Sequence, residues 1–407
     1  MASTERSGIT NFQILDTQLY ADSVEWCPFD GLQNILLCGT YQLLEQTSNE
    51  SDSIKNEAQV RVGQLQMYYL QQPSQEDEDK LPSLSVSCCV DTSGILDVKW
   101  ARNFSSSVPL FGLVNASGEC QLWKVSDRDE NTVTTQNEAS NHLADTLKDS
   151  DCLRKMLLPL KTEKIGDCLA LSLDWTGPLE SSSPKIVVSD SSGSLSVLEA
   201  GNDFRMTSHW HAHDYEAWIC AFDMWNPEIV YSGSDDCKMK VWDLRAGSQP
   251  VKTNSGFDMG VCSIQSNPLR ESLLAVGSYD ENLRIFDRRN MKQPLSVSSL
   301  GGGVWRVKWE PFQANRILTA SMHNGFHILD CSLPDSEPLP VLAHYTEHSS
   351  LAYGADWSRL FAGSRTTRKE NDRALSNAEN EIFATECYLI STCSFYDHSL
   401  HLWQWTL

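Results

Sequence analysis

The sequence contains no run of eighteen or more apolar residues, which excludes a membrane-spanning helix. Its first residues, MASTERSGITNFQ, lack the apolar stretch of a secretory signal, so we expect the protein in the cytoplasm, with the nucleus as a second compartment. Basic residues are few: 32 Lys and Arg stand against 54 Asp and Glu, for a formal net charge of −22. Such a surface repels phosphate, which argues against nucleic acid and for a basic or cationic partner.

Cysteine pairs at metal-binding spacing are also missing, because no CxxC motif occurs among the thirteen cysteines. The cysteines lie within apolar runs such as ILLCGT, WICAF and GVCSI, where a thiol behaves as a small hydrophobic group. Cys88 and Cys89 are adjacent, so a strand would point them to opposite faces. We therefore expect buried reduced cysteines, no structural zinc site and no cofactor.

The strongest positive signal is an internal repeat. A short alternating strand recurs seven times and ends on Trp or, once, on Ser. A second strand, a turn and a third strand ending in a large apolar residue follow it, as in IVYSGSDDCKMKVWD and LLAVGSYDENLRIFD. The shorter intervals match the repeat of about 40–45 residues that is typical of a propeller blade. The seven strand ends are Trp26, Trp100, Trp175, Trp225, Ser266, Trp309 and Trp357.

Repeat four, AHDYEAWICAFDMWNPEIVYSGSDDCKMKVWDLR, resembles the WD40 family most clearly. The resemblance implies an all-β fold, a seven-bladed β-propeller with four antiparallel strands per blade. It also assigns His213, Ser232, Asp236 and Trp242 to a buried hydrogen-bonded set that satisfies the carboxylate and the indole N–H. We therefore expect these residues to be structural rather than a catalytic Ser, His and Asp group.

The whole chain, 1–407, is expected to form one monomeric propeller. Segment 11–20 would close the last blade beside the C-terminal strand SLHLWQWTL. Four polar segments have too few apolar residues to fold and are expected to be unstructured insertions. They lie at 45–59, 71–83, 126–151 and 363–381. The blades are expected near 21–70, 84–125, 165–199, 213–245, 258–289, 302–331 and 350–406.

Aromatic and acidic residues are expected to gather at one mouth of the central channel. Glu216 and Trp218 stand where the chain enters the innermost strand of repeat four. Trp305 and Tyr353 occupy comparable stretches of repeats six and seven. Together these residues predict a binding surface, and the alternative is that they only pack the blade ends. Tyrosines recur beside the turns of three repeats, as Tyr41, Tyr279 and Tyr396.

Longer sequence segments that are more specific than the repeat pattern occur in all seven repeats. They include DSVEWCP, LLCGTYQL, CLALSLDW, EAWICAF, MGVCSIQS, GSYDE, GGVWRVKWEPF, YGADW and STCSFYDHSLHLW. They resemble the diphthine methylesterases of the eukaryotic diphthamide pathway, historically called diphthine methyltransferases. The resemblance implies a hydrolase that acts on elongation factor 2. The modified histidine of that factor carries a trimethylammonium group and a methyl ester, and cleavage of the ester gives diphthine.

The expected mouth suits the substrate that the resemblance implies. Aromatic faces hold a quaternary ammonium group at about 0.5–2 kcal/mol per contact, and neighbouring carboxylates add attraction. Trp218, Trp305 and Tyr353 would supply the faces and Glu216 the carboxylate. Elongation factor 2 carrying methylated diphthine is accordingly the expected partner.

Ester cleavage needs an activated nucleophile and donors for the oxyanion. No GxSxG motif occurs, so the α/β-hydrolase mechanism is excluded. Two routes stay open: water activated by a general base, or a nucleophile at a strand end such as Cys262 or Ser394. We favour water, with His323 or His398 as the catalytic base, because imidazole titrates in the useful range. His323 replaces a turn aspartate, and His398 directly follows one.

Two other functions fit the same pattern. Most propellers of this kind bind proteins, so a non-enzymatic interaction scaffold is the main alternative. A scaffold would leave its partner unaltered and would tolerate substitution of His323 and His398. A reader of methylated lysine would also use an aromatic and acidic mouth, and it would bind trimethyl-lysine peptides.

Overall fold

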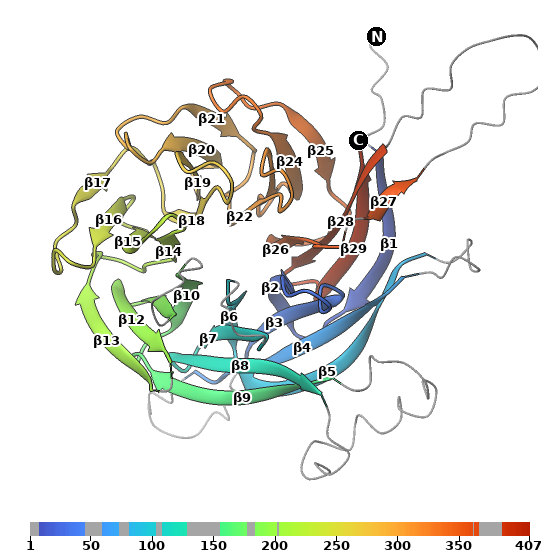
Figure 1. Cartoon of the computed structure of the whole chain (residues 1–407), viewed down its shortest axis with the longest axis horizontal. Helices are drawn as coiled ribbons and strands as arrows, with labels where there is room; N and C mark the ends of the chain where they lie inside the picture. The colour runs from blue at the N-terminus through green and yellow to red at the C-terminus, as the bar shows by residue number, and fades with distance from the viewer. Residues whose placement is uncertain are drawn as a thin grey trace, which may run out of the picture.

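The described residues of the computed structural model form seven antiparallel blades around a central channel (Figure 1). The predicted all-β, seven-bladed propeller is confirmed. No helix in this part of the chain is long and apolar enough to span a membrane. The polar segments predicted as insertions lie largely outside the described residues. The structure describes residues 8–44, 59–72, 81–102, 108–127, 155–176, 184–201, 203–360, 362–365 and 385–407.

Six blades are four-stranded sheets whose strands follow chain order from the channel outwards. Blades one to three contain β2 (Tyr20–Trp26), β3 (Ile35–Leu43), β4 (Arg61–Gln71), β5 (Ser83–Ser93); β6 (Ile95–Trp100), β7 (Leu110–Asn115), β8 (Glu119–Asp127), β9 (Lys155–Lys164); and β10 (Ala170–Trp175), β11 (Lys185–Asp190), β12 (Ser194–Ala200), β13 (Phe204–His211). Blades four to six contain β14 (Ile219–Asp223), β15 (Asn226–Gly233), β16 (Met239–Asp243), β17 (Lys252–Asn254); β18 (Val261–Ser266), β19 (Leu273–Ser278), β20 (Asn282–Asp287), β21 (Ser296–Ser299); and β22 (Arg306–Trp309), β23 (Arg316–Ala320), β24 (Phe326–Asp330), β25 (Val341–Tyr345).

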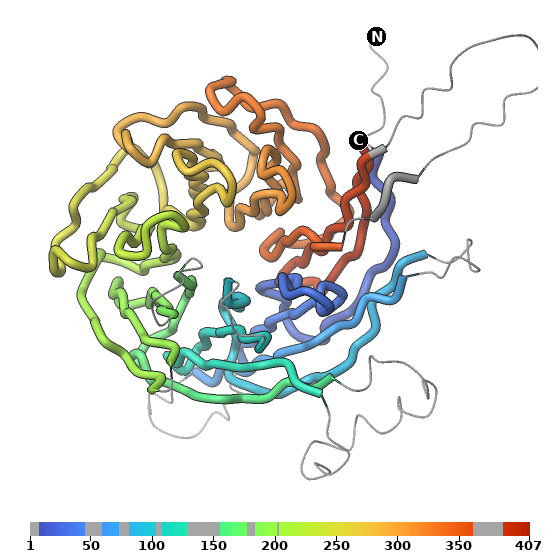
Figure 2. The backbone as a smooth tube through the Cα atoms, in the orientation of Figure 1, coloured from blue at the N-terminus to red at the C-terminus, as the bar shows by residue number. Residues whose placement is uncertain are grey.

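The seventh blade joins the two ends of the chain. Its order is β26 (Ala352–Trp357), β28 (Thr385–Ser394), β29 (Ser399–Thr406) and β1 (Gly8–Asp16), and β27 (Ala362–Arg365) also pairs with β28. The blue N-terminal strand lies beside the red C-terminal strand in Figure 2, with Gly8 opposite Thr406 and Asp16 opposite Ser399. The closing strand thus starts before the predicted segment 11–20 and ends before Tyr20, which begins β2.

Buried apolar side chains fill the space between neighbouring blades. Leu37 of blade one and Val98 of blade two belong to one cluster, and Ile264 of blade five packs with Tyr231 of blade four in another. The inner strands therefore have both faces buried, each face against a neighbouring blade. Most of the described cysteines are buried, and the adjacent pair has Cys88 buried and Cys89 exposed, as predicted.

Hydrogen bonds between neighbouring blades repeat around the channel, and they correct one predicted strand end. The backbone N–H of Trp26 donates to Asp356 Oδ2 (2.8 Å), and that of Phe222 donates to Asp174 Oδ2 (2.8 Å). Phe222 is therefore the blade-four counterpart of Trp26. The predicted strand end, Trp225, was wrong, because β14 stops at Asp223 and Trp225 lies in the following turn with 42% of its surface exposed.

The hydrogen-bonded set predicted in repeat four is confirmed. His213 places Nδ1 2.9 Å from Asp236 Oδ2 and Nε2 2.7 Å from Ser232 Oγ. The indole N–H of Trp242 donates to the same Ser232 oxygen (2.8 Å). Burial lowers the pKa of His213 although Asp236 acts to raise it. Because each member already has a buried partner, this group ties the strands of the blade together.

Candidate active site at the channel mouth

Bulges in the innermost strands determine which residues face the channel mouth. Five of these strands shift register near their first residue, and a bulge redirects the side chain at that point. The residues skipped by the five shifts are Asp22, Leu96, Leu171, Cys262 and Tyr353. In blades four and six, Trp218 and Trp305 stand directly before the inner strand. Each blade therefore places one residue, at or just before the start of its inner strand, at the mouth.

Four of the predicted binding residues form a continuous aromatic cluster at this mouth. Trp305 is central: its ring centroid lies 4.9 Å from Tyr353, 5.4 Å from Trp218 and 6.4 Å from Tyr279. The Trp305 and Tyr353 rings are stacked, whereas the Trp218 and Tyr279 rings meet Trp305 edge to face. Both arrangements are favourable for aromatic pairs, so the cluster holds its faces in place before any ligand binds.

The cluster continues towards blade seven and reaches the fifth predicted aromatic residue. Tyr353 lies 4.9 Å from Phe395, and Phe395 lies 5.0 Å from Tyr396. Tyr20 contacts both Phe395 (4.9 Å) and Tyr396 (5.3 Å). Sequence reasoning missed Phe395 and Tyr20, since neither occupies a position that recurs between repeats. Tyr396 has 61% of its surface exposed and forms the outer edge of the cluster.

Glu216 lies beside Trp218 and contributes negative charge to the rim. It is half-buried, and its carbonyl accepts the backbone N–H of Asp235 (3.1 Å). Burial raises the pKa of Asp235, the nearby Glu216 charge adds to the rise, and the Trp218 indole limits it. The indole N–H faces that carboxylate outside hydrogen-bonding geometry and is otherwise unpaired among the described residues. The rim next to the aromatic cluster therefore carries two acids.

The predicted histidines occupy different places. His323 is exposed and lines an open groove of about 480 Å³ together with Tyr396, between blades six and seven. His398 is half-buried in the turn between β28 and β29, with its ring 4.9 Å from that of Tyr20. The structure thus brings both histidines to the blade-seven side of the aromatic cluster.

The two alternative nucleophiles are both buried. Ser394 donates to the Asp397 carboxylate and lies 2.6 Å from His348 Nδ1, while His348 Nε2 lies 2.9 Å from Thr392 Oγ1. This is the blade-seven counterpart of the structural set in blade four, because Trp403 Nε1 also donates to Thr392 (3.1 Å). Burial raises the pKa of the Cys262 thiol well above its ordinary value, which disfavours the reactive thiolate.

A small hollow lies beneath the aromatic residues. Its volume of about 20 Å³ is space for one water molecule. Asp22, which sequence reasoning did not single out, is in its wall with 6% of its surface exposed. Burial raises the pKa of Asp22 to about 8, Arg306 limits the rise and Asp97 adds to it. The hollow is lined by Asp22, Leu96, Leu171, Ser172, Trp218, Cys262, Trp305 and Arg306.

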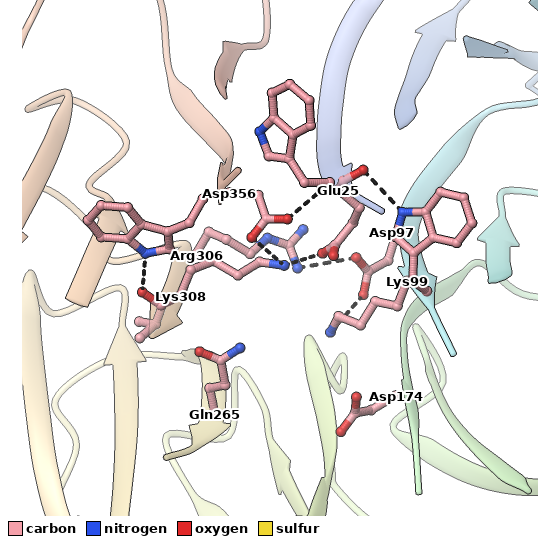
Figure 3. Close-up of polar contacts among 12 residues, drawn as sticks. Glu25, Asp97, Lys99, Asp174, Gln265, Arg306, Lys308 and Asp356 are labelled. Carbon is pink, nitrogen blue, oxygen red and sulfur yellow. Dashed lines mark hydrogen bonds and ion pairs between the residues drawn. The ribbon is translucent and has the colours of Figure 1, made fainter. Parts of the chain in front are cut away.

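Further down the channel, charged side chains from blades far apart in sequence form ion pairs (Figure 3). Arg306 NH1 lies 3.2 Å from Asp97 Oδ1, and Lys308 contacts Glu25 and lies 3.7 Å from Asp356 Oδ1. Arg306 lines both the hollow and a second cavity, whose wall also contains Lys308 and Asp356. Across the described part of the chain, no group of three or more His, Cys, Asp or Glu side chains is arranged to hold a metal ion.

Comparisons with known proteins agree with the fold and extend it. The family model "WD domain, G-beta repeat" matches residues 205–243, which include most of blade four. A chain of the mitotic checkpoint complex crystal structure superposes with a TM-score of 0.60 at 14% identity, covering 99% of this chain and 94% of that one. At that identity the likeness concerns the fold alone.

Similarity over nearly the whole sequence identifies the family. Human diphthine methyltransferase is 36% identical, covering 98% of this chain and 99% of the human protein. The mouse protein of that name is 35% identical over 100% of this chain and 96% of its own length. The diphthine methyltransferase homolog of Dictyostelium discoideum is 34% identical over 97% and 98%. Because these relatives match the chain over nearly its full length, and the chain forms a seven-bladed propeller with an aromatic mouth, it belongs to the diphthine methyltransferase family.

Proposed function

We propose that the chain is a carboxylic ester hydrolase that removes the methyl ester from the diphthine methyl ester intermediate on elongation factor 2. Water attacks the ester carbonyl, methanol leaves, and the carboxylate of diphthine remains. The reaction consumes one water and requires no methyl donor. The observation that carries the proposal is the aromatic cluster of Trp218, Trp305, Tyr353 and Tyr279 beside a hollow of water size, in a member of this family.

The mouth supports recognition of the trimethylammonium group. Aromatic faces attract such a cation, and the attraction grows when water is excluded. The acids at the rim, Glu216 and Asp235, lie on the same side as Trp218 and add a favourable field. Since the ester and the ammonium group belong to one side chain, binding the cation at the rim directs the ester towards the hollow.

A protein substrate needs a surface as well as a pocket. Tyr215 and Met259 are exposed in the segments that lead into the inner strands β14 and β18, and Tyr396 is exposed in the turn between β28 and β29. Together with the open groove beside Tyr396, they offer a docking area around the mouth. The net charge of −22 supports a basic protein partner, which we propose is elongation factor 2 in the cytoplasm, bound by one copy of the chain.

Intact-mass analysis tests the proposal directly. Elongation factor 2 bearing the methyl ester is measured before and after incubation with the wild-type protein, His323→Ala and His398→Ala. We expect the wild type to remove the mass of one methylene group per molecule. A folded but inactive histidine variant would show that this histidine is needed for cleavage. Binding without any mass change would favour the scaffold, and binding of trimethyl-lysine peptides instead would favour the methyl-lysine reader.

Trp305→Ala should lower kcat/KM about 10- to 30-fold, mainly through KM. The reason is that Trp305 offers its own face and also positions Tyr353, Trp218 and Tyr279. A loss of about 1.4–2 kcal/mol of cation binding corresponds to that factor. Initial rates of ester cleavage measure the effect. Trp225→Ala is the matched control, because Trp225 lies in a turn outside the mouth, and equal losses in both variants would contradict the role of Trp305.

A further inference from the structure

Asp22 is a buried acid that the fold does not satisfy. Its side chain sits at the register shift between Ala21 and Ser23 and is 6% exposed. Within the described part of the chain, only burial and the charges of Arg306 and Asp97 act on the pKa of its carboxyl, and no hydrogen bond does. Asp97, whose charge acts on Asp22, by contrast accepts from Ser172 Oγ (3.1 Å), the Leu173 N–H (3.3 Å) and Arg306 (3.2 Å). Burying an unpaired carboxyl is costly, so its position calls for a reason other than packing.

Asp22 lies beside the place where an ester bond held at the mouth would be located. It lines the water-sized hollow under Trp218 and Trp305, and Arg306 is the one Lys, Arg or His among the described residues in that wall. The aromatic residues above the hollow are those that we propose bind the ammonium group. A carboxylate, a water site and a guanidinium thus converge on the place that the ester reaches.

We propose that Asp22 is the general base of the ester hydrolysis and that Arg306 stabilises the oxyanion; this inference rests on the proposed function. The Asp22 carboxylate takes a proton from the water in the hollow as the water oxygen bonds to the ester carbonyl carbon. The negative charge on the former carbonyl oxygen faces Arg306. When the tetrahedral intermediate collapses, the bond to the methoxy oxygen breaks and the Asp22 proton passes to the departing methoxide. The products are methanol and the carboxylic acid, which loses its proton to solvent.

The other groups in the wall are less suited to this role. Leu96 and Leu171 carry no proton acceptor, and burial raises the pKa of the Cys262 thiol far above neutrality. Ser172 donates its hydroxyl to Asp97. Burial also places the pKa of Asp22 at about 8, near the pH at which a general base is most effective. The carboxylate fraction therefore rises as the pH is raised towards and through 8.

The test compares wild type with Asp22→Asn and Asp258→Asn on the methyl-ester form of elongation factor 2. Asp258 is an exposed acid near the mouth that does not line the hollow, so its variant controls for the lost charge. General-base catalysis contributes about 10²–10⁴-fold, so we expect Asp22→Asn to lower kcat by that factor with KM changed less than threefold. Its melting temperature should equal or exceed that of the wild type, which separates lost chemistry from misfolding.

The pH dependence of the wild-type rate supplies a second readout that needs no variant. We expect kcat/KM to rise with pH through about 8, where half of the Asp22 carboxyl is ionised, before it levels off. A flat profile between pH 6 and 9, or an Asp22→Asn variant within threefold of wild type, would overturn the role of Asp22 while leaving the esterase intact. A wild-type protein that leaves the ester uncut would overturn the proposed function and this inference together.

Discussion

Asp22→Asn stabilises the folded protein, and the gain grows as the pH rises from about 4 to about 8. In the unfolded chain the carboxyl loses its proton near its ordinary pKa of 3.8, whereas burial holds the folded pKa near 8. Between these values the folded state binds one more proton than the unfolded state, so wild-type stability falls with rising pH. Each pKa unit is worth about 1.4 kcal/mol, which gives a cost on the order of 5 kcal/mol above pH 8.

The amide of the variant does not titrate, so the variant does not lose this stability as the pH rises. Urea unfolding of wild type and Asp22→Asn at pH 5 and pH 8 measures the difference. We expect a small gain at pH 5 and a gain of several kcal/mol at pH 8. The exposed Asp258→Asn serves as the control for simple loss of a charge. A gain that is the same at both pH values, or a loss of stability at pH 8, would mean that Asp22 is ionised and satisfied in the fold.

The ring itself is predictable from sequence because its signals are local. Each blade repeats a pattern of alternating residues and a turn within one stretch of chain, and the set of His213, Ser232, Asp236 and Trp242 lies within thirty residues. The failure at Trp225 has a physical origin. The strand ends early at Asp223, and Tyr231 fixes that residue by donating to its carboxylate (2.6 Å), so the tryptophan falls in the turn.

The mouth was only half predictable, for a reason that Asp22 illustrates. Aromatic residues at the entrance of repeats stand out by type, and Trp218, Trp305 and Tyr353 could be named in advance. Asp22 belongs to the ordinary alternation of DSVEW until a bulge shifts the register. A shift by one residue moves a side chain to the other face of its strand. The residues skipped by these shifts differ in type from blade to blade, as Asp22, Cys262 and Tyr353 show, so no sequence pattern marks them in advance.

Contacts across the channel are the least visible in sequence. Lys308 of blade six reaches Glu25 of blade one, and Arg306 of the same strand reaches Asp97 of blade two. No periodic pattern relates these positions, since the partners meet only after the ring has closed. The charged layer in Figure 3 is thus a property of the assembled propeller, and it fixes Arg306 beneath the hollow.

Lys308→Met should destabilise the protein by about 3–5 kcal/mol, the range for a buried ion pair that loses one partner. Although burial lowers the pKa of Lys308, Asp356 and Glu25 raise it more, so the ammonium is charged. Without it, the buried carboxylates of Glu25 and Asp356, on neighbouring inner strands, would lie close together with no cation between them. Burial already raises the pKa of Glu25 to about 7 with Lys308 present.

The double variant Glu25→Gln/Lys308→Met separates this electrostatic cost from lost packing. It removes the Glu25 carboxylate that Lys308→Met leaves without a cation. We therefore expect it to recover at least half of the stability lost by Lys308→Met, as measured by urea unfolding at pH 8. Without the ammonium the folded Glu25 pKa lies still further above its unfolded value. The single variant should therefore lose more stability at pH 8 than at pH 5, where Glu25 is protonated in the folded state. A deficit below 1 kcal/mol at pH 8 would show that the carboxylates are hydrated and that Lys308 does not hold this layer together.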